Sequence, residues 1–162
     1  MLSIDGTDIR VPEKGPDWWS HKFKKSAVRY EVGVGIKTGD ICWFSGPYQA
    51  GVWPDVEIFR ASLVSFLDPY ERVEADDGYI GEAPLRVMCP GCVTCPAGRK
   101  DMMKKVRERQ ETVNKRLKQW NILVKTYIHD ILDHRDVFAS ICVLTQLAIE
   151  NGEPLFQVEY SN

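Results

Sequence analysis

The segment over residues 105–120 constrains the fold most, because its apolar residues have the spacing of one helix face. Steps of three, four and seven separate these residues, which are Val106, Val113, Leu117 and Trp120, together with Met103 just before the segment. We expect this face to be buried. Glu111 lies on a different stripe, between Arg107, Lys115 and Lys118. The pattern predicts an acid presented from a basic helix surface, with ordinary solvent-exposed ion pairs as the alternative.

Two further acids follow short β-prone runs. Asp5 comes after such a run at the start of the chain, in a strand expected over residues 1–7 that stops at an Asp-Gly turn. Asp76 follows a strand expected over residues 72–75, with Asp77 beside it as the alternative acid. Two strand-end aspartates and a helix glutamate can hold Mg²⁺, which binds few carboxylates together with phosphate oxygens. Asp-Gly after a β-prone run is also a common turn signal.

The remaining pattern predicts an α/β chain. Further strands are expected over residues 28–37, 40–45 and 85–88, the first two forming a hairpin that Gly46-Pro47 closes. Helices are expected over residues 54–67, 122–132 and 137–149. The core stripe of the first of these helices is expected to comprise Ile58, Leu63, Phe66 and Leu67. Residues 12–25 and 155–160 read as a loop and an extended tail. This order predicts a mixed five-stranded sheet flanked by helices.

Length and composition indicate one domain over residues 1–162. Hydrophobic residues make up 44% and charged residues 27%, as in ordinary soluble proteins. No apolar run approaches a membrane span, and the start of the chain lacks the features of a signal peptide. We therefore expect an intracellular protein with no membrane partner.

The net charge of −2 conceals two basic stretches. Residues 99–118 hold nine Lys/Arg against three Asp/Glu, and residues 10–29 hold six against two. Such segregation suits an acidic metal site flanked by surfaces that contact phosphates; solvated charged faces are the alternative. The expected phosphate contacts are Lys22, Lys24, Lys25, Arg107, Asn114, Lys115 and Lys118.

Five cysteines, an odd number, argue against a disulfide framework. Cys89, Cys92 and Cys95 have zinc-like spacing but supply three ligands where structural zinc takes four. We expect a reduced, exposed loop without zinc, with a zinc module as the alternative. His129 and His134 do not share a helix face, which predicts structural roles. Asp55 near a helix start is expected to interact with the helix dipole.

Several motifs together resemble the catalytic domain of DDE transposases, specifically the PIF/Harbinger-like group of DDE superfamily endonucleases. The resemblance covers nearly the whole chain and rests on SIDGTD (3–8), YEV (30–32), TGD (38–40), GP (46–47), PD (54–55), IFR (58–60), ADDGYIG (75–81), ETVNKRLK (111–118) and the helix over 138–149. It implies an RNase H-like fold with Asp5, Asp76 and Glu111 as the catalytic acids. The 34 residues between Asp76 and Glu111 are similar to the spacing that names the family.

The resemblance also implies a function. It implies a DNA endonuclease and strand transferase in the nucleus that cuts DNA ends with two Mg²⁺ or Mn²⁺ ions held by these acids. The helical DNA-binding region usual upstream in the family does not appear in the sequence, so we expect a catalytic core that relies on a separate DNA-binding partner protein, with a homodimer as a possible assembly. The alternative is a domesticated or degenerate copy that binds DNA or protein without cleaving.

Overall fold

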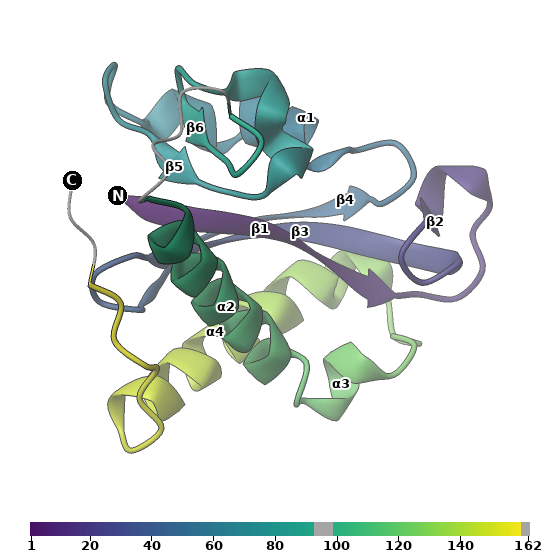
Figure 1. Cartoon of the computed structure of the whole chain (residues 1–162). Helices are drawn as coiled ribbons and strands as arrows, with labels where there is room; N and C mark the ends of the chain where they lie inside the picture. The colour runs from purple at the N-terminus through teal and green to yellow at the C-terminus, as the bar shows by residue number, and fades with distance from the viewer. Residues whose placement is uncertain (93–98, 160–162) are drawn as a thin grey trace.

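A long antiparallel strand pair forms the centre of the sheet in the computed structural model, which describes residues 1–92 and 99–159. β1 (Leu2–Arg10) pairs with β3 (Lys25–Gly35) along its whole length. β4 (Ile41–Gln49) and the short β2 (Trp19–Ser20) also pair antiparallel with β3. On the other side of β1, β5 (Val73–Glu74) runs parallel to it and β6 (Val87–Met88) runs parallel to β5. The sheet is therefore mixed, with β1 near its middle (Figure 1).

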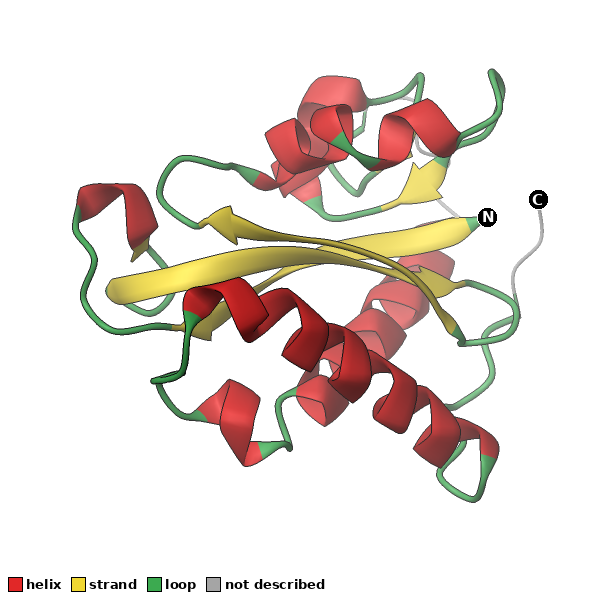
Figure 2. Cartoon of the chain, turned by 180° about the vertical axis from the view of Figure 1, so that it is seen from behind, coloured by secondary structure: helices red, strands yellow, loops and turns green. Residues whose placement is uncertain are grey.

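Helices cover both faces of this sheet. The two long helices, α2 (Lys100–Leu117) and α4 (His134–Glu150), lie on one face, and α1 (Asp55–Ala61) lies on the other (Figures 1 and 2). The 3-10 helices η2 (Leu63–Phe66) and η3 (Asp77–Glu82) pack beside α1. The described residues also form the short helices η1 (Pro16–Trp18), α3 (Asn121–Val124) and η5 (Ile131–Asp133).

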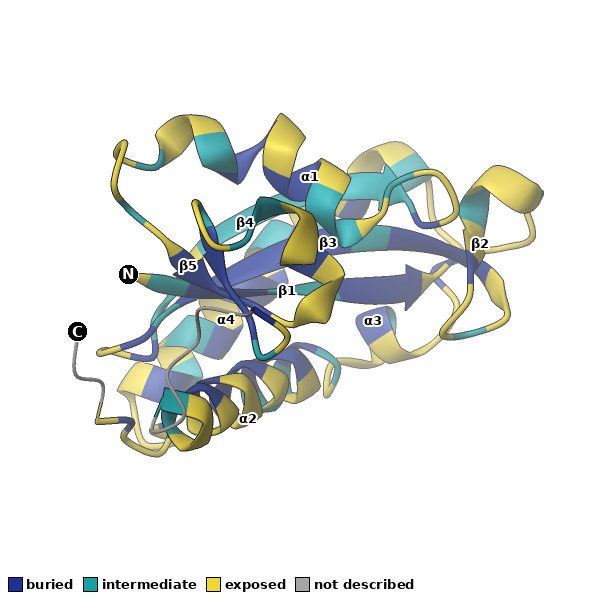
Figure 3. Cartoon of the chain, turned by 45° about the horizontal axis from the view of Figure 1, so that its top comes forward, coloured by how far each residue is buried: buried dark blue, intermediate teal, exposed yellow. Residues whose placement is uncertain are grey.

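Strand alternation divides the interior into two main hydrophobic cores. Tyr30 and its alternate neighbours on β3 face α4, where the Tyr30 ring stacks on Phe138 at 3.8 Å between centroids. The Tyr30 hydroxyl also shares a hydrogen bond of 2.8 Å with Nδ1 of buried His134. On the opposite face, Ile4 packs with Phe59 and other residues of the α1 side. Figure 3 shows α2 with an exposed outer face and buried positions toward the sheet.

The first strand is longer than its sequence predicts. Asp5 lies inside β1 and does not end it, because pairing with β3 continues from Leu2↔Gly35 to Arg10↔Ala27. Gly6 faces Asp55 so closely that a Cβ there would lie 2.2 Å from Asp55 Oδ1. The Asp-Gly dipeptide thus serves close packing of α1 on the strand, and reading it as a turn is wrong.

Other expected boundaries also change. The helix expected over residues 54–67 breaks at Ser62, whose hydroxyl bonds the Ile58 carbonyl, and Phe66 is 72% exposed rather than part of the core. The helix expected over 122–132 is wrong, because α3 ends at Val124. Trp120 is 40% exposed because α2 ends at Leu117.

Within the described residues the sheet has six strands where five were expected, β2 being the addition. Gly46 and Pro47 lie inside β4, joined by a cis peptide bond, and do not close the hairpin. None of the helices in residues 1–92 and 99–159 has the length and apolar character needed to cross a membrane.

Candidate functional site

A cavity of about 600 Å³ lies between β1, the end of β5 and α2. All three acids singled out in the sequence line it, Asp5 from β1, Asp76 from the end of β5 and Glu111 from α2. Five of the seven expected phosphate contacts line the same cavity, namely Lys22, Arg107, Asn114, Lys115 and Lys118. Lys24 and Lys25 do not belong to its lining. Residues up to 115 positions apart in sequence therefore meet in one cleft.

Asp5 is an acid of this cleft whose pKa is clearly shifted. Its Oδ2 accepts a hydrogen bond of 2.7 Å from Asn114 Nδ2. Burial, followed by the nearby charges of Asp76 and Asp55, raises the pKa of Asp5 to about 7, although Lys22 acts in the opposite direction. A half-buried carboxyl in a cleft, with its pKa shifted by desolvation and by neighbouring acids, is a candidate functional group.

The parallel pairing of Ser3 with Glu74 brings the end of β5 beside Asp5. Asp76 Oδ1 accepts a hydrogen bond of 2.8 Å from Gly78 N and so caps η3. Asp77 faces elsewhere, since its Oδ1 accepts from Gly91 N at 2.7 Å and it does not line the cavity. The geometry therefore favours Asp76 over Asp77 as the acid of this site.

Buried polar side chains hold α2 against the sheet and so set the direction of Glu111. Arg109 donates to the carbonyl oxygens of Gly35 and Ile36. Gln110 accepts from Ser3 Oγ at 2.7 Å and donates to the Val32 carbonyl at 3.0 Å. Together with Asn114, these contacts fix the rotation of the helix about its axis. Glu111 then faces the cavity from an exposed position on α2.

The sequence reading missed Gln110 and Arg109 because polar residues on a basic helix suggest a solvated face. A signal existed for Gln110, which lies four residues after Val106 and three before Val113 and so falls within the apolar stripe. A polar residue at such a position is expected to be buried with hydrogen-bond partners.

The oxygen atoms of the cavity suit a divalent cation. Asn114 Oδ1 and Thr7 Oγ1 are buried and, in the part of the chain that the structure describes, lack hydrogen-bond partners. Carboxylate, amide and hydroxyl oxygens are the ligands that Mg²⁺ accepts. Among the described residues, however, no three His, Cys, Asp or Glu side chains are close enough to hold a metal ion as they stand. The acids share a cleft without forming a ready coordination sphere.

The far end of the cleft is basic. Burial and the neighbouring Lys22 lower the pKa of Lys118 to about 8, although Asp8 and Asp5 act against this. The Lys118 Nζ lies 5.4 Å from the centroid of the Phe23 ring, and the Arg10 guanidinium lies 4.8 Å from it. Cations crowded in this way favour an anionic ligand that offsets their mutual repulsion.

The cysteines differ from expectation. Cys89 and Cys92 are buried in the core on the α1 side, so the expected exposed loop is wrong for these two. Burial raises the pKa of Cys89 to about 11, which favours the protonated thiol. Cys95 lies outside the described residues, and the absence of zinc stays a prediction.

Asp55 begins α1 as expected and also lies 3.5 Å from the Arg29 guanidinium.

A mixed sheet that carries an acidic cleft with a basic wall defines a class of α/β proteins suited to phosphodiester chemistry. The sequence model described as DDE superfamily endonuclease matches residues 4–146, and the chain belongs to this family. Membership indicates a transposase-type nuclease and implies a DNA substrate, and enzymes of the family normally use divalent metal ions. No curated protein matches the chain. No solved structure matches it either.

Proposed function

We propose that this chain is the catalytic core of a metal-dependent DNA endonuclease and strand transferase of the PIF/Harbinger-like group. The observation that carries the proposal is the single cavity shared by Asp5, Asp76 and Glu111 and rimmed by lysine and arginine. The strand arrangement, in which an antiparallel unit of β4, β3 and β1 continues into parallel β5 and β6, supports an RNase H-like fold. From the resemblance to the PIF/Harbinger-like group, we also propose that the protein acts in the nucleus with a separate DNA-binding partner.

The three acids would hold two Mg²⁺ or Mn²⁺ ions, which when bound activate an attacking oxygen and stabilise the leaving oxygen. Asp5 must be ionised for this role, and the amide of Asn114 orients its carboxylate. Because the acids line the cavity without clustering, the proposal requires Asp76 and Glu111 to approach Asp5 when metal and DNA enter.

The basic residues supply binding and orientation. Arg107 and Lys115 lie one turn before and one turn after Glu111 on α2, where they would contact phosphates on either side of the bond to be cut. Lys22 and Lys118 line the same cleft. Contacts of this kind position the duplex without reading its sequence.

The test is cleavage of supercoiled plasmid DNA in the presence of Mn²⁺ or Mg²⁺. We expect nicking by the wild-type chain and its reduction to background in Asp5→Asn, Asp76→Asn and Glu111→Gln. Asp77→Asn is the matched control, because its carboxylate bonds Gly91 N and lies outside the cavity lining, and it should keep activity. DNA binding without metal-dependent nicking in the wild type would contradict the proposal and favour a binding protein.

A further inference from the structure

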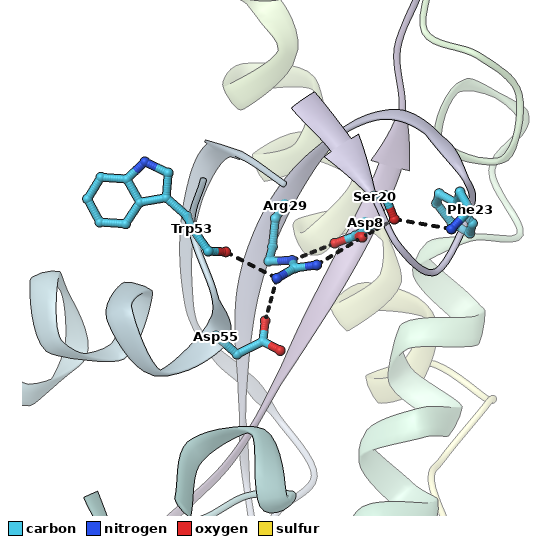
Figure 4. Close-up of polar contacts among 6 residues, drawn as sticks. All are labelled: Asp8, Ser20, Phe23, Arg29, Trp53 and Asp55. Atoms are coloured by element: carbon cyan, nitrogen blue, oxygen red, sulfur yellow. Dashed lines mark hydrogen bonds and ion pairs between the residues drawn. The ribbon is translucent and has the colours of Figure 1, made fainter. Parts of the chain in front are cut away.

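A polar network lies on the face of β1 opposite Asp5. Asp8 and Arg29 are directly paired in the register of β1 and β3. Arg29 Nε donates to Asp8 Oδ1 at 2.7 Å and Nη2 donates to Asp8 Oδ2 at 3.1 Å, a two-point ion pair with Asp8 only 3% exposed. Figure 4 shows Arg29 at the centre of this network, between Asp8 on one side and Trp53 and Asp55 on the other.

The network connects α1 to the loop over residues 21–24. Toward α1, Arg29 Nη1 donates to the Trp53 carbonyl at 3.1 Å and lies 3.5 Å from Asp55 Oδ1. Toward the loop, fully buried Ser20 donates to Asp8 Oδ2 at 2.6 Å, and its Oγ accepts from Phe23 N at 3.2 Å. The Ser20 hydroxyl is thus held between the ion pair and the loop backbone (Figure 4).

This loop carries one end of the cleft. Lys22 lines the cavity that holds Asp5, and it influences the pKa values of both Asp5 and Lys118. The Phe23 ring lies against Lys118, the residue that follows α2, and against Arg10 of β1. The loop therefore brings two cations from separate segments to the Phe23 ring, and its own Lys22 lies close enough to Lys118 to lower the pKa of that side chain.

We propose that Ser20, held by the Asp8–Arg29 pair, is a positioning residue that orders the loop so that Lys22, Lys118 and Arg10 form a phosphate subsite for the DNA strand. The inference rests on the proposed function for the identity of the ligand. Side chains ordered before binding lose less conformational entropy when a phosphate arrives, so an ordered loop binds more tightly than a loose one with the same charges. None of the positioning residues needs to contact DNA.

A purely structural role predicts a different result. If the network only stabilises the sheet, its loss lowers the melting temperature and leaves the number of phosphate contacts unchanged. A positioning role changes the dependence of DNA affinity on salt, because each lost phosphate contact lowers the slope of log K against log salt by about 0.9 for duplex DNA.

The experiment measures the fluorescence anisotropy of a labelled duplex of about 20 base pairs, roughly two helical turns. The titration is carried out in EDTA at a range of salt concentrations. We expect Lys22→Ala to lower the slope by about one contact. Ser20→Ala should lower it by a similar amount and weaken binding several-fold, and the double variant should lose little more than either single variant. Ser26→Ala is the control, since Ser26 is equally buried and donates to Glu13 Oε1 at 2.8 Å, away from Asp8, and it should keep the wild-type slope.

Three outcomes overturn the inference: a wild-type slope in Ser20→Ala beside a reduced slope in Lys22→Ala, no change in Lys22→Ala, or full additivity of the two changes. Should Ser20→Ala fail to fold, Phe23→Leu tests the same loop at its contact with Lys118, and an unchanged slope there overturns the inference. The measurement needs neither metal nor cleavage, so a chain that binds in this way but never nicks DNA would contradict the proposed function alone.

Discussion

The two faces of β1 hold acids in opposite circumstances. On the α1 face, Asp8 is bound by two nitrogen atoms of Arg29 and by the Ser20 hydroxyl. On the α2 face, Asp5 receives one amide hydrogen bond from Asn114 and has other acids near it, and its pKa rises to about 7. Removal from solvent alone therefore does not mark a functional acid. A carboxylate with a cation partner supports the fold, and a carboxylate without one is available to bind an ion.

The largest effect is expected from breaking the pair on the α1 face. Arg29→Met leaves Asp8 buried without its cation and should destabilise the protein by roughly 3–5 kcal/mol. Urea unfolding measures this change. Arg60 is the matched control, because it also contacts two carboxylates, Glu57 and Glu82 at 2.6 Å each, but on the surface. A loss in Arg60→Met as large as that in Arg29→Met would contradict the claim that burial of Asp8 makes its ion pair important for stability.

A smaller loss is expected from Cys89→Ser in the core behind the α1 face. Cys89 is completely buried among apolar residues, and a serine hydroxyl there lacks solvent, at a cost of about 1–3 kcal/mol. Cys42→Ser, at an exposed position, should stay within about 0.5 kcal/mol of wild type. Thermal unfolding compares the two, and equal stability of both variants would contradict the buried placement of Cys89.

On the α2 face the expected change in the free energy of unfolding has the opposite sign, and Asp5→Asn should stabilise the metal-free protein. The pKa of Asp5 is raised from 3.8 to about 7 in the folded state, so between these values the folded protein binds more protons than the unfolded chain. Stability conferred by the protonated carboxyl therefore falls as pH rises through this window. The variant should exceed wild type by roughly 1–3 kcal/mol above pH ~7 and match it near pH ~4.

Urea unfolding in chelator at several pH values measures that difference. Glu31, whose pKa burial raises to about 8, titrates in both proteins, so its contribution cancels in the difference between them. A gap between variant and wild type that stays constant across the pH range would show that Asp5 does not titrate in this way.

The smallest effect concerns Asn114. Asn114→Ala removes the donor to Asp5 and should raise the pKa of Asp5 further, since that donor favours the ionised form. We expect Mn²⁺ affinity to fall about 10-fold, as for other groups that orient a metal ligand. Isothermal titration at pH ~6 and ~8 measures this, and the loss should be larger at the lower pH, where less of Asp5 is ionised. Equal affinity in variant and wild type would make Asn114 a packing residue.

Part of this site follows from sequence. The apolar stripe through Val106 and Val113 predicted α2, because the spacing of apolar residues along one segment is enough to indicate a helix with one buried face. It also predicted that Glu111 lies on a different side of that helix. The short β-prone run before Asp76 likewise predicted β5. The residue pattern alone did not decide whether Asp76 or Asp77 faces the cleft, and the hydrogen bond of Asp77 with Gly91 N depends on the folded structure.

The remainder depends on long-range packing that a linear pattern does not encode. In the sequence, Gly6 after Asp5 is typical of a turn. In the structure, Asp55 of α1 occupies the space that a side chain at position 6 would need, and β1 continues to Arg10. Asp8 and Arg29 lie 21 residues apart, and their pairing depends on the register of β1 and β3. Once that register is known, their pairing follows from opposite charge at directly facing positions.

Thermal unfolding with and without Mn²⁺ shows whether the acids of the α2 face bind metal as a group. A ligand that binds only the folded state stabilises it by about 2.7 kcal/mol at 100 times its Kd. We predict a concentration-dependent rise in Tm for wild type and Asp77→Asn, and loss of most of that rise in Asp5→Asn, Asp76→Asn and Glu111→Gln. An equal Mn²⁺ response in all five proteins, or loss of the response in Asp77→Asn alone, would contradict the claim.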